Sequence, residues 1–383
     1  MILASILIIS AFWLLYHVKF IFTRIPLLKD IEAKHSEEKE LVSIIVPARN
    51  EENNIIPCLE SLVGLEYGNK EIIVVNDRSE DMTEELVRNF MKEHSEVKLV
   101  NGRELEPGWI GKTFALSQGL REARGNLVLF TDADTRHSPE NLSLAVRKLE
   151  SGNTAVVSVL PFLMAIGFWE KVIQPFVAEM FLVSMPFDKV NDLHSRVVLC
   201  NGQFFLTYRK IIEEVGGLES IKENILDDIA LARKIKDRGH GIYLCYGEKL
   251  FTVRMYTKLG EIINGWSKNF YRGFTLNYPG IMVIPAVIIL LFFYVLPVFL
   301  PIIAILLHAP YTFTLFSFLP LSIEVVSTFF KRRKYGMYPE TAWTIPLGAL
   351  LYSYIMINST LRTVLGIGVK WKGRSYYRKD NKT

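Results

Sequence analysis

Two aspartates, Asp132 and Asp134, follow the apolar run Leu127–Thr131 at a spacing that suits metal chemistry. Alternate residues at the frayed end of a strand can direct both carboxylates into one cleft. Hard carboxylate oxygens beside a diphosphate hold Mg²⁺ or Mn²⁺, which takes its remaining ligands from phosphate and water. The pair therefore predicts a metal and diphosphate site, although the same tripeptide also occurs as an ordinary turn. The sequence contains neither GxxxxGK[ST] nor GxGxxG, so the two best-known phosphate-binding loops are absent.

Three further acids stand where strands are expected to end or helices to begin. Asp77 ends a second apolar run, where it can accept a hydrogen bond from a nucleobase or ribose, or simply form an Asx turn. Asp227 and Asp228 precede the segment Ile229–Lys236, which has an apolar stripe. Capping and the helix dipole favour acids in a first helical turn. One of the two can instead act as a general base if a hydroxyl comes within about 3 Å.

Basic and aromatic residues offer weaker signals. Lys112 opens a predicted helix, where a cation opposes the helix dipole, so a nearby phosphate would explain its position. Trp266 and Lys268 belong to a basic and aromatic cluster just before a hydrophobic region, a pattern typical of a membrane-interface anchor. His137 is expected to be a structural turn residue rather than a ligand.

These residues need a scaffold, and the pattern between Leu41 and about Gly247 indicates one. Apolar runs of strand length alternate there with helical patterns, which means βαβ units and a mostly parallel sheet. The predicted strands are 42–46, 71–76, 97–101 and 127–131, and the predicted helices are 53–63, 83–94 and 112–122. Ligands of such sheets bind beyond the carboxyl ends of the strands. Pro47–Glu51, Asp77–Asp81 and Asp132–Asp134 are all expected at that edge.

The composition places this α/β region beside a membrane. The chain has 383 residues, of which 50% are hydrophobic and 22% charged, with a mean hydropathy of +0.22. These values exclude a disordered chain. Cys58, Cys200 and Cys245 are too far apart for a zinc ribbon or a disulfide scaffold, and they fit a reducing compartment. The net charge is +4, and the basic residues gather near the hydrophobic segments. This pattern favours a membrane surface as the partner and argues against a nucleic acid.

The N-terminal segment has the length of a membrane span. Residues 1–18 carry no charged side chain and are followed by Lys19, Arg24 and Lys29. A secretory signal would carry basic residues before its apolar core and a cleavage site after it. We therefore expect a transmembrane helix with Met1 outside and Lys29 in the cytosol.

Three apolar stretches follow near the C-terminus, at 281–308, 311–330 and 342–367. The basic run Lys331–Lys334 is expected in the cytosol, so the first two stretches carry the chain out and back. If the third also spans, the basic tail ends outside, and this stretch contains Asn358 and Arg362. A re-entrant or interfacial helix, or a first stretch split into two passes, would resolve the conflict.

Taken together, the motifs resemble family 2 glycosyltransferases of the GT-A fold. The resemblance covers roughly 41–274 and rests on four stretches, 42–51, 74–79, 131–134 and 226–231. More narrowly, the chain is similar to membrane-bound enzymes that glycosylate carotenoids or hopanoid-type lipids. That narrower likeness rests on Asn201–Gln203, Gly216–Gly217, Trp266–Asn269 and Trp371–Arg374.

The resemblance implies a role for each matching residue. The acid matching Asp77 contacts uracil, Asp132 handles ribose or diphosphate, Asp134 holds the metal, and Asp228 is the base. The remaining candidates are Pro47, Ala48, Glu51 and Lys112 for the nucleotide sugar, and Asp227, Gln203, Trp266 and Lys268 for the acceptor or diphosphate side.

Two departures from the family pattern narrow the expectation. The usual Glu-Asp pair is Asp227-Asp228 here, which is shorter by one methylene. The QxxRW motif of processive synthases is missing, because Ile262 stands in place of the glutamine and Gly265 precedes Trp266. This argues against polymerisation of the cellulose, chitin or hyaluronan type.

We therefore expect an α/β, GT-A catalytic domain with a Rossmann-like, mostly parallel sheet, joined to transmembrane helices. The predicted ranges are 1–24 for an N-terminal membrane helix, 40–275 for the glycosyltransferase domain, 279–367 for a C-terminal membrane region and 368–383 for a basic tail. The protein would be a multi-pass membrane enzyme with a cytosolic catalytic domain. With Mg²⁺ or Mn²⁺ it would transfer one sugar, with inversion, from a nucleotide-diphosphate sugar such as UDP-hexose to a lipid hydroxyl.

Three alternatives remain. A polyprenyl-phosphate sugar synthase shares the fold but uses a phosphate acceptor. A nucleotidyltransferase could use a similar sheet, but it gives no reason for Trp266 or the C-terminal helices. A non-catalytic membrane scaffold would use the same acids only as caps.

Overall fold

The computed structural model describes residues 10–15, 24–31, 40–152, 154–275, 278–367, 369–371 and 374–376. Its contacts divide the chain into two compact units. The α/β unit contains Ile25–Phe162 and Pro186–Arg254, and the helical unit contains Met1–Arg24, Leu163–Met185 and Met255–Thr383. Residues 163–185 and 255–275, which the predicted glycosyltransferase range includes, thus belong to the helical unit. Most of the predicted N-terminal helix and basic tail lies outside the described residues.

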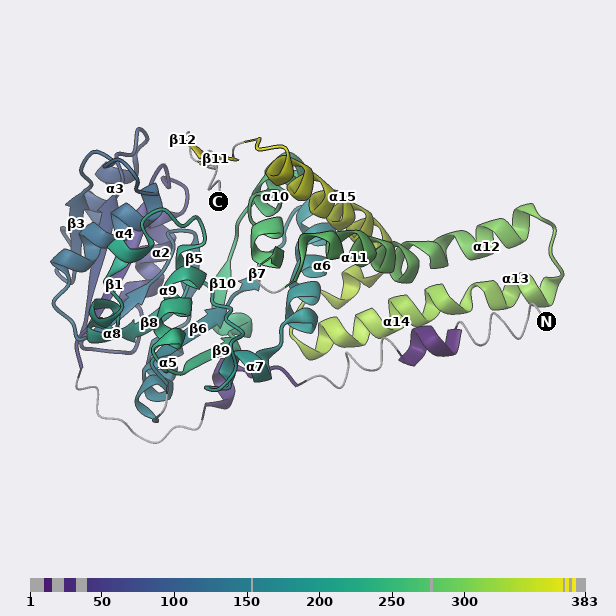
Figure 1. The fold of residues 1–383 in the computed structure, drawn as a ribbon, viewed down its shortest axis with the longest axis horizontal. Coiled ribbons are helices and arrows are strands. Elements are labelled where there is room, and N and C mark those ends of the chain that lie inside the picture. Colours follow the sequence, from purple (N-terminus) through teal and green to yellow (C-terminus); the bar gives the residue numbers. More distant parts are fainter. Residues whose placement is uncertain are drawn as a thin grey trace. The chain divides into compact units, whose positions relative to one another are not determined.

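A seven-stranded sheet forms the centre of the α/β unit, in the order β3-β2-β1-β4-β8-β6-β9 (Figure 1). Its strands are β1 (Val42–Ala48), β2 (Lys70–Asn76), β3 (Val97–Asn101), β4 (Leu127–Phe130), β6 (Val156–Leu160), β8 (Phe205–Tyr208) and β9 (Ile242–Tyr246). Neighbouring strands pair in parallel except at β8, which is antiparallel to both β4 and β6. The prediction of an α/β fold with a mostly parallel sheet is confirmed.

Short strands and helices connect this sheet. The additional strands are β5 (Thr135–His137), β7 (Phe162–Leu163) and β10 (Phe251–Val253), and β5 pairs antiparallel with β10. The helices are α2 (Ile55–Val63), α3 (Thr83–Phe90), α4 (Gly111–Glu122), α5 (Asn141–Glu150), α7 (Phe187–Asn191), α8 (Arg209–Glu214) and α9 (Asp227–Asp237). Three 3₁₀ turns are η1 (Leu28–Asp30), η2 (Leu218–Ile221) and η3 (Glu248–Leu250).

Both faces of the parallel strands are buried, which explains why β1 and β2 read as continuous apolar runs. Ile44 and Ile72 belong to a core shared with α2 and α5. On the other face α4 approaches so closely that a Cβ on Gly119 would lie 2.5 Å from Ile45 Cγ2 and 2.9 Å from Val75 Cγ2. A glycine at this point of α4 therefore lets the helix that carries Lys112 sit directly on the sheet.

The helical unit is built from long helices. They are α6 (Phe168–Ser184), α10 (Leu259–Thr275), α11 (Val283–Leu290), α12 (Leu296–Leu306), α13 (Tyr311–Ser317), α14 (Leu319–Lys334) and α15 (Ile345–Val364). Shorter elements are η4 (Gly280–Met282), the π turn η5 (Leu291–Val295), η6 (Pro339–Thr344), β11 (Val369–Trp371) and β12 (Arg374–Tyr376). Residues 10–15 are helical, and Trp13 is buried with its Nε1 donating to the Phe293 carbonyl at 2.9 Å.

Two helices among the described residues are long and apolar enough to cross a membrane, Gly280–Leu306 and Tyr311–Lys334. The first apolar stretch thus forms one continuous helical run of 27 residues. The third apolar stretch forms α15, and its polar side chains make hydrogen bonds with α10. Ser359 Oγ accepts from the Tyr271 amide at 2.9 Å, and Arg362 Nη2 donates to Asn264 Oδ1 at 3.2 Å.

The basic run that ends α14 is only partly exposed. Arg333 and Lys334 are exposed, but Lys331 and Arg332 are almost completely buried. Glu179 of α6 explains their burial, because it forms ion pairs with both, to Lys331 through Oε1 and to Arg332 Nε at 3.5 Å through Oε2. A buried charge cluster therefore ties α6 to α14 within the helical unit.

Candidate active site

The loops after β1 and β2 are held together at the carboxyl edge of the sheet. The Asp77 amide donates to the Ala48 carbonyl at 2.8 Å, and Arg49 Nη1 donates to the Asp77 carbonyl at 2.8 Å. Asn50 and Arg78 have positive φ values of 52° and 55°, so both loops turn sharply at these positions.

Four of the predicted nucleotide residues meet in these loops. Pro47 and Ala48 end β1, Glu51 follows in the loop, and Asp77 lies buried directly after β2. The Glu51 amide donates to Thr83 Oγ1 at 2.8 Å, which joins this loop to the start of α3. The structure thus places the four residues at one edge of the sheet, as their positions at parallel strand ends predict.

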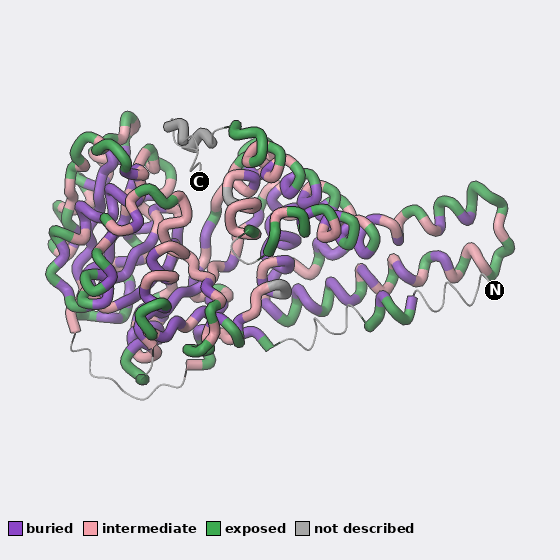
Figure 2. The backbone as a smooth tube through the Cα atoms, in the orientation of Figure 1, coloured by how far each residue is buried: buried purple, intermediate pink, exposed green. Residues whose placement is uncertain are grey.

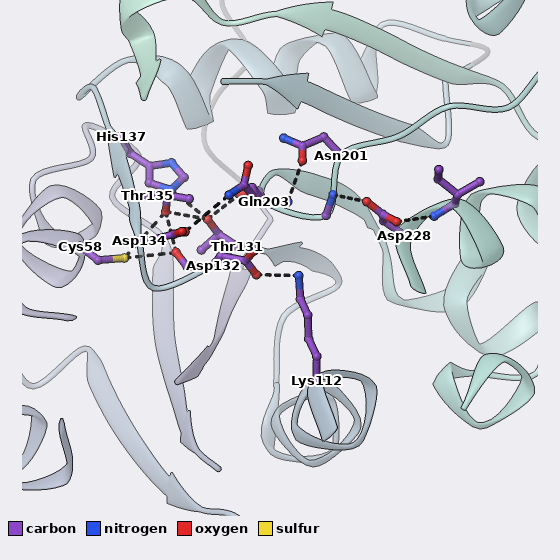
Figure 3. Close-up of polar contacts among 12 residues, drawn as sticks. Cys58, Lys112, Thr131, Asp132, Asp134, Thr135, His137, Asn201, Gln203 and Asp228 are labelled. Atoms are coloured by element: carbon purple, nitrogen blue, oxygen red, sulfur yellow. Dashed lines mark hydrogen bonds and ion pairs between the residues drawn. The ribbon is translucent and has the colours of Figure 1, made fainter. Parts of the chain in front are cut away.

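The aspartate pair lies in the turn between β4 and β5 (Figure 3). Asp132 Oδ1 is 2.7 Å from Lys112 Nζ, and 27% of the Asp132 side chain remains exposed. Gln203 Nε2 lies 3.5 Å from Asp134 Oδ1, at the limit of hydrogen-bond distance. Thr135 Oγ1 donates to the Asp132 carbonyl at 2.7 Å and fixes the turn. The fold therefore brings Lys112, from α4, and Gln203, from the segment before β8, to the two acids.

His137 is a structural residue behind this turn. Its Nδ1 accepts from Asn141 Nδ2 at 3.1 Å, so Nε2 carries the proton toward Thr131 Oγ1 at 3.0 Å. Burial lowers the pKa of His137 to about 3, which keeps the ring neutral. The expectation of a structural role agrees with this geometry.

Asp227 and Asp228 occupy the first turn of α9, and two backbone amides hold Asp228. Gly202 N donates to Asp228 Oδ2 at 2.7 Å, and Ile229 N donates to Oδ1 at 2.8 Å. Each carboxylate oxygen has a second lone pair, so Asp228 can still accept a proton. A Cβ at Gly202 would lie 3.2 Å from Asp228 Cβ, so only glycine leaves this approach unhindered.

Four charges in this region perturb one another. Burial and then the charge of Asp227 raise the pKa of Asp228 to about 6, although Lys112 and the two amides oppose the shift. Burial also raises the pKa of Asp227, against the charge of Lys112. For Lys112 burial alone would lower the pKa, but Asp132, Asp227 and Asp228 outweigh it and raise the pKa. One lysine thus compensates three carboxylates, an arrangement that concentrates negative charge where a base is expected.

The pKa of Asp228 predicts an acidic limit to activity. If ionised Asp228 is the base, kcat/KM should fall about tenfold per pH unit below about pH 6, because the protonated acid cannot accept a proton. Asp227→Asn removes a charge that raises this pKa, so the acidic limb should move to lower pH. Transfer rates of the wild type and of Asp227→Asn between about pH 4.5 and 8 would measure this decline and its shift. The same acidic decline in both proteins would contradict the influence of Asp227 on the pKa of Asp228.

The site can hold a metal ion if a bound diphosphate supplies part of its ligands. Among the described residues no group of three or more His, Cys, Asp or Glu side chains could hold a metal ion. Asp132 and Asp134 supply two carboxylates, which is the number that Mg²⁺ commonly takes from protein when substrate phosphates complete its shell. The donor set therefore fits a metal that arrives with, or is retained by, a nucleotide diphosphate.

Trp266 and Lys268 lie on α10, in the helical unit. Trp266 Nε1 donates to Gln174 Oε1 at 3.2 Å, and its ring packs on Phe181 of α6. This contact gives Trp266 a structural function inside that unit. A role of either residue on the acceptor side stays a prediction.

Sequence reasoning missed the groups that position the acids. The Gly202 amide acts on Asp228 through the backbone, and the Arg49 side chain acts on the Asp77 carbonyl, so neither contact leaves a mark on residue spacing. Arg49 lies in the 42–51 stretch, and Gly202 lies in the Asn201–Gln203 stretch, which also carried part of the family resemblance. Its glycine is explained by the close approach of Asp228.

This α/β domain has a mostly parallel sheet, with acids and a lysine near the carboxyl ends of its strands. Domains of this architecture bind ligands such as nucleotides at that edge of the sheet. Residues 43–216 match the model of glycosyl transferase family 2. This part of the chain is a family 2 glycosyltransferase domain, and the protein is a glycosyltransferase. Asp227 and Asp228 lie beyond the matched residues.

Individual proteins are similar to this chain over different lengths. The chain is 26% identical over 345 residues to the 4,4'-diaponeurosporenoate glycosyltransferase of Staphylococcus aureus, covering 88% of each chain. It is 35% identical over 113 residues to a probable glycosyltransferase of Bacillus subtilis, covering 29% of this chain and 26% of that protein. Its structure is also similar to a mannosyltransferase of Pyrobaculum calidifontis in complex with GDP-mannose and Mn²⁺, at 18% identity, with 95% and 96% of the two chains covered and a TM-score of 0.49.

Proposed function

We propose that this glycosyltransferase is membrane-associated and transfers one hexose, with inversion, from UDP-hexose to the hydroxyl of a membrane lipid. The observation that carries the proposal is Asp228, a carboxylate with a pKa of about 6 that two amides hold beside Lys112 and Asp227. A base with a pKa near the working pH is what attack by a protonated hydroxyl requires.

In the proposed reaction Asp228 takes the proton of the acceptor hydroxyl as that oxygen attacks C1 of the sugar. The bond between C1 and the diphosphate oxygen breaks, and UDP leaves with the electron pair. Lys112 Nζ lies 2.7 Å from Asp132 Oδ1, and its positive charge can stabilise the leaving diphosphate. When bound, Mg²⁺ or Mn²⁺ on Asp134 and Asp132 would supply further positive charge there. Asp77 and the Pro47–Glu51 loop would hold the uridine.

Membrane association is supported by the helices rather than by the catalytic site. Gly280–Leu306 and Tyr311–Lys334 have the length and hydropathy of membrane spans. We propose a cytosolic α/β unit, since basic residues flank the apolar segments on that side under the positive-inside rule. Such helices would keep the protein at the bilayer in which a lipid acceptor lies.

A carboxylate acceptor is the second candidate, because the name of the Staphylococcus aureus relative specifies a carboxylate substrate. A carboxylate has a pKa of about 4 and is already ionised near neutrality, so it would need no base. The two candidates therefore differ in their dependence on Asp228.

Metal dependence gives a binding prediction. UDP should bind at least about tenfold more tightly with Mn²⁺ or Mg²⁺ than with EDTA, since charge-assisted contacts contribute about 1.5–3 kcal/mol each. Asp134→Asn should abolish this gain, whereas Asp237→Asn, an exposed acid at the far end of α9, should keep it. Calorimetric titration would measure both. Equal affinity with metal and with EDTA in the wild type would refute the metal assignment.

The product can be identified in cells. Lipid extracts from cells with and without the gene should differ by one or more lipids whose mass is greater by a single hexose. Mass spectrometry of the extracts would show this. Extracts with no such difference, from cells that make the protein, would count against a lipid acceptor.

A further inference from the structure

The helix α14 has its polar and apolar faces reversed relative to a helix of a water-soluble protein. Glu324, Thr328 and Arg332 are completely buried at helical spacing, whereas Val326 and Phe330 are each 54% exposed. Figure 2 shows buried and exposed turns alternating along this helix. An apolar stripe normally faces the protein core. Large exposed apolar surface on such a helix indicates that its surroundings are hydrocarbon.

An apolar groove lies between residues 325–330 of α14 and residues 339–343 of η6, within the helical unit. Val325, Val326, Phe329 and Phe330 form one wall, and Trp343 and Glu340 of η6 belong to the other. The groove holds about 490 Å³, which lies in the range of small-molecule sites. Among the described residues that line it, Glu340 is the single charged one.

The chemistry of the groove fits one hydrocarbon chain of a membrane lipid. It opens on a helix of membrane length, so lipid chains are the molecules that reach it. Trp343 is 66% exposed, and with Phe329 and Phe330 it offers flat aromatic surface against which a chain can pack. Arg333, exposed at the end of α14, is a cation within a turn of Phe330 for a lipid head group.

We propose that this groove binds one hydrocarbon chain of a membrane lipid as a defined site, distinct from the general lipid contact of the other exposed helices. The inference rests on the membrane location within the proposed function, but not on the transferase chemistry. Because lipid tails are as apolar as the groove, retention must come from packing rather than from the hydrophobic effect. A side chain that fills the groove should therefore displace the lipid.

The test uses the full-length protein in phosphatidylcholine vesicles that contain a small fraction of phosphatidylcholine with a diazirine in one acyl chain. After illumination, mass spectrometry of peptides locates the crosslinks. We expect labelling of 325–330 and of Trp343 that saturates as the probe fraction rises. Val326→Trp should reduce this labelling to background, and Ile305→Trp should not, although Ile305 of α12 is equally exposed at 55%.

Each other outcome overturns the inference. Labelling that rises linearly and equally on α12 and α14 would mean general lipid contact only. Groove labelling that Val326→Trp leaves unchanged would place the lipid elsewhere. Groove labelling no greater than that of α12, in protein that has entered the vesicles, would leave the groove without a bound chain. Failure of the protein to enter vesicles at all would instead refute the proposed membrane location, so the two failures are distinguishable.

Discussion

Asp228→Asn is expected to slow sugar transfer by about 10²- to 10⁴-fold, the usual loss when a general base is removed. The reason is that a lipid hydroxyl is fully protonated near pH 7 and cannot attack without losing its proton. UDP binding should persist, because Asp228 contacts the Gly202 and Ile229 amides rather than the loops that hold Asp77. Initial rates with saturating donor, together with UDP titration, would measure both quantities.

The neighbouring acids provide the controls. Asp227→Asn should lose less activity, and Asp237→Asn, on the same helix but exposed, should lose none. In Asp228→Asn the new side-chain amide must face one of two backbone N–H groups, so thermal unfolding of each variant should accompany the rates. Near-normal turnover by Asp228→Asn with intact donor binding would reject the base and favour the carboxylate or a phosphate acceptor.

Glu179→Gln is expected to destabilise the helical unit by about 3–5 kcal/mol, the cost of breaking a buried ion pair from one side. Lys331 and Arg332 are almost completely buried, and Glu179 is the acid that pairs with both. A neutral glutamine would remove the ion-pair partner of both cations in a medium of low dielectric. Unfolding of the full-length protein in detergent would measure the loss.

Glu324→Gln is the matched control, since Glu324 is also fully buried but neither of its carboxylate oxygens has a hydrogen-bond partner among the described residues. This variant has no bond to lose, so its stability should change little. Equal losses in both variants would show that burial of any acid on this interface, and not the pairing of Glu179, determines stability.

The sheet edge was predictable from sequence because its signals are local. Apolar runs located β2 and β3 to within a residue, and parallel pairing then required Asp77, Asp132 and the Pro47–Glu51 loop to share one edge. Helix starts were equally local, as α9 beginning at Asp227 shows. The antiparallel strand β8 was not predicted, since pairing direction depends on distant strands.

The features that the sequence could not reveal depend on pairs far apart in the chain. Gly202 reaches Asp228 across 26 positions through a backbone amide, which no side-chain pattern records. The burial of Lys331 and Arg332 in the basic run of α14 could not be predicted, because Glu179 lies 152 positions before Lys331. Charge patterning alone treats every such run as surface, and only the packing of α6 on α14 shows that half of it is buried.

The most direct test of lipid glycosylation is transfer by the purified protein itself. Full-length protein would be reconstituted in vesicles made from the lipids of cells that carry the gene, with Mn²⁺ and one radiolabelled UDP-hexose at a time. We predict that label from one hexose enters the organic phase in the same amount as UDP is released, and that Asp228→Asn abolishes this. Release of UDP with all label left as free hexose in water, or no consumption of any UDP-hexose, would contradict the proposal.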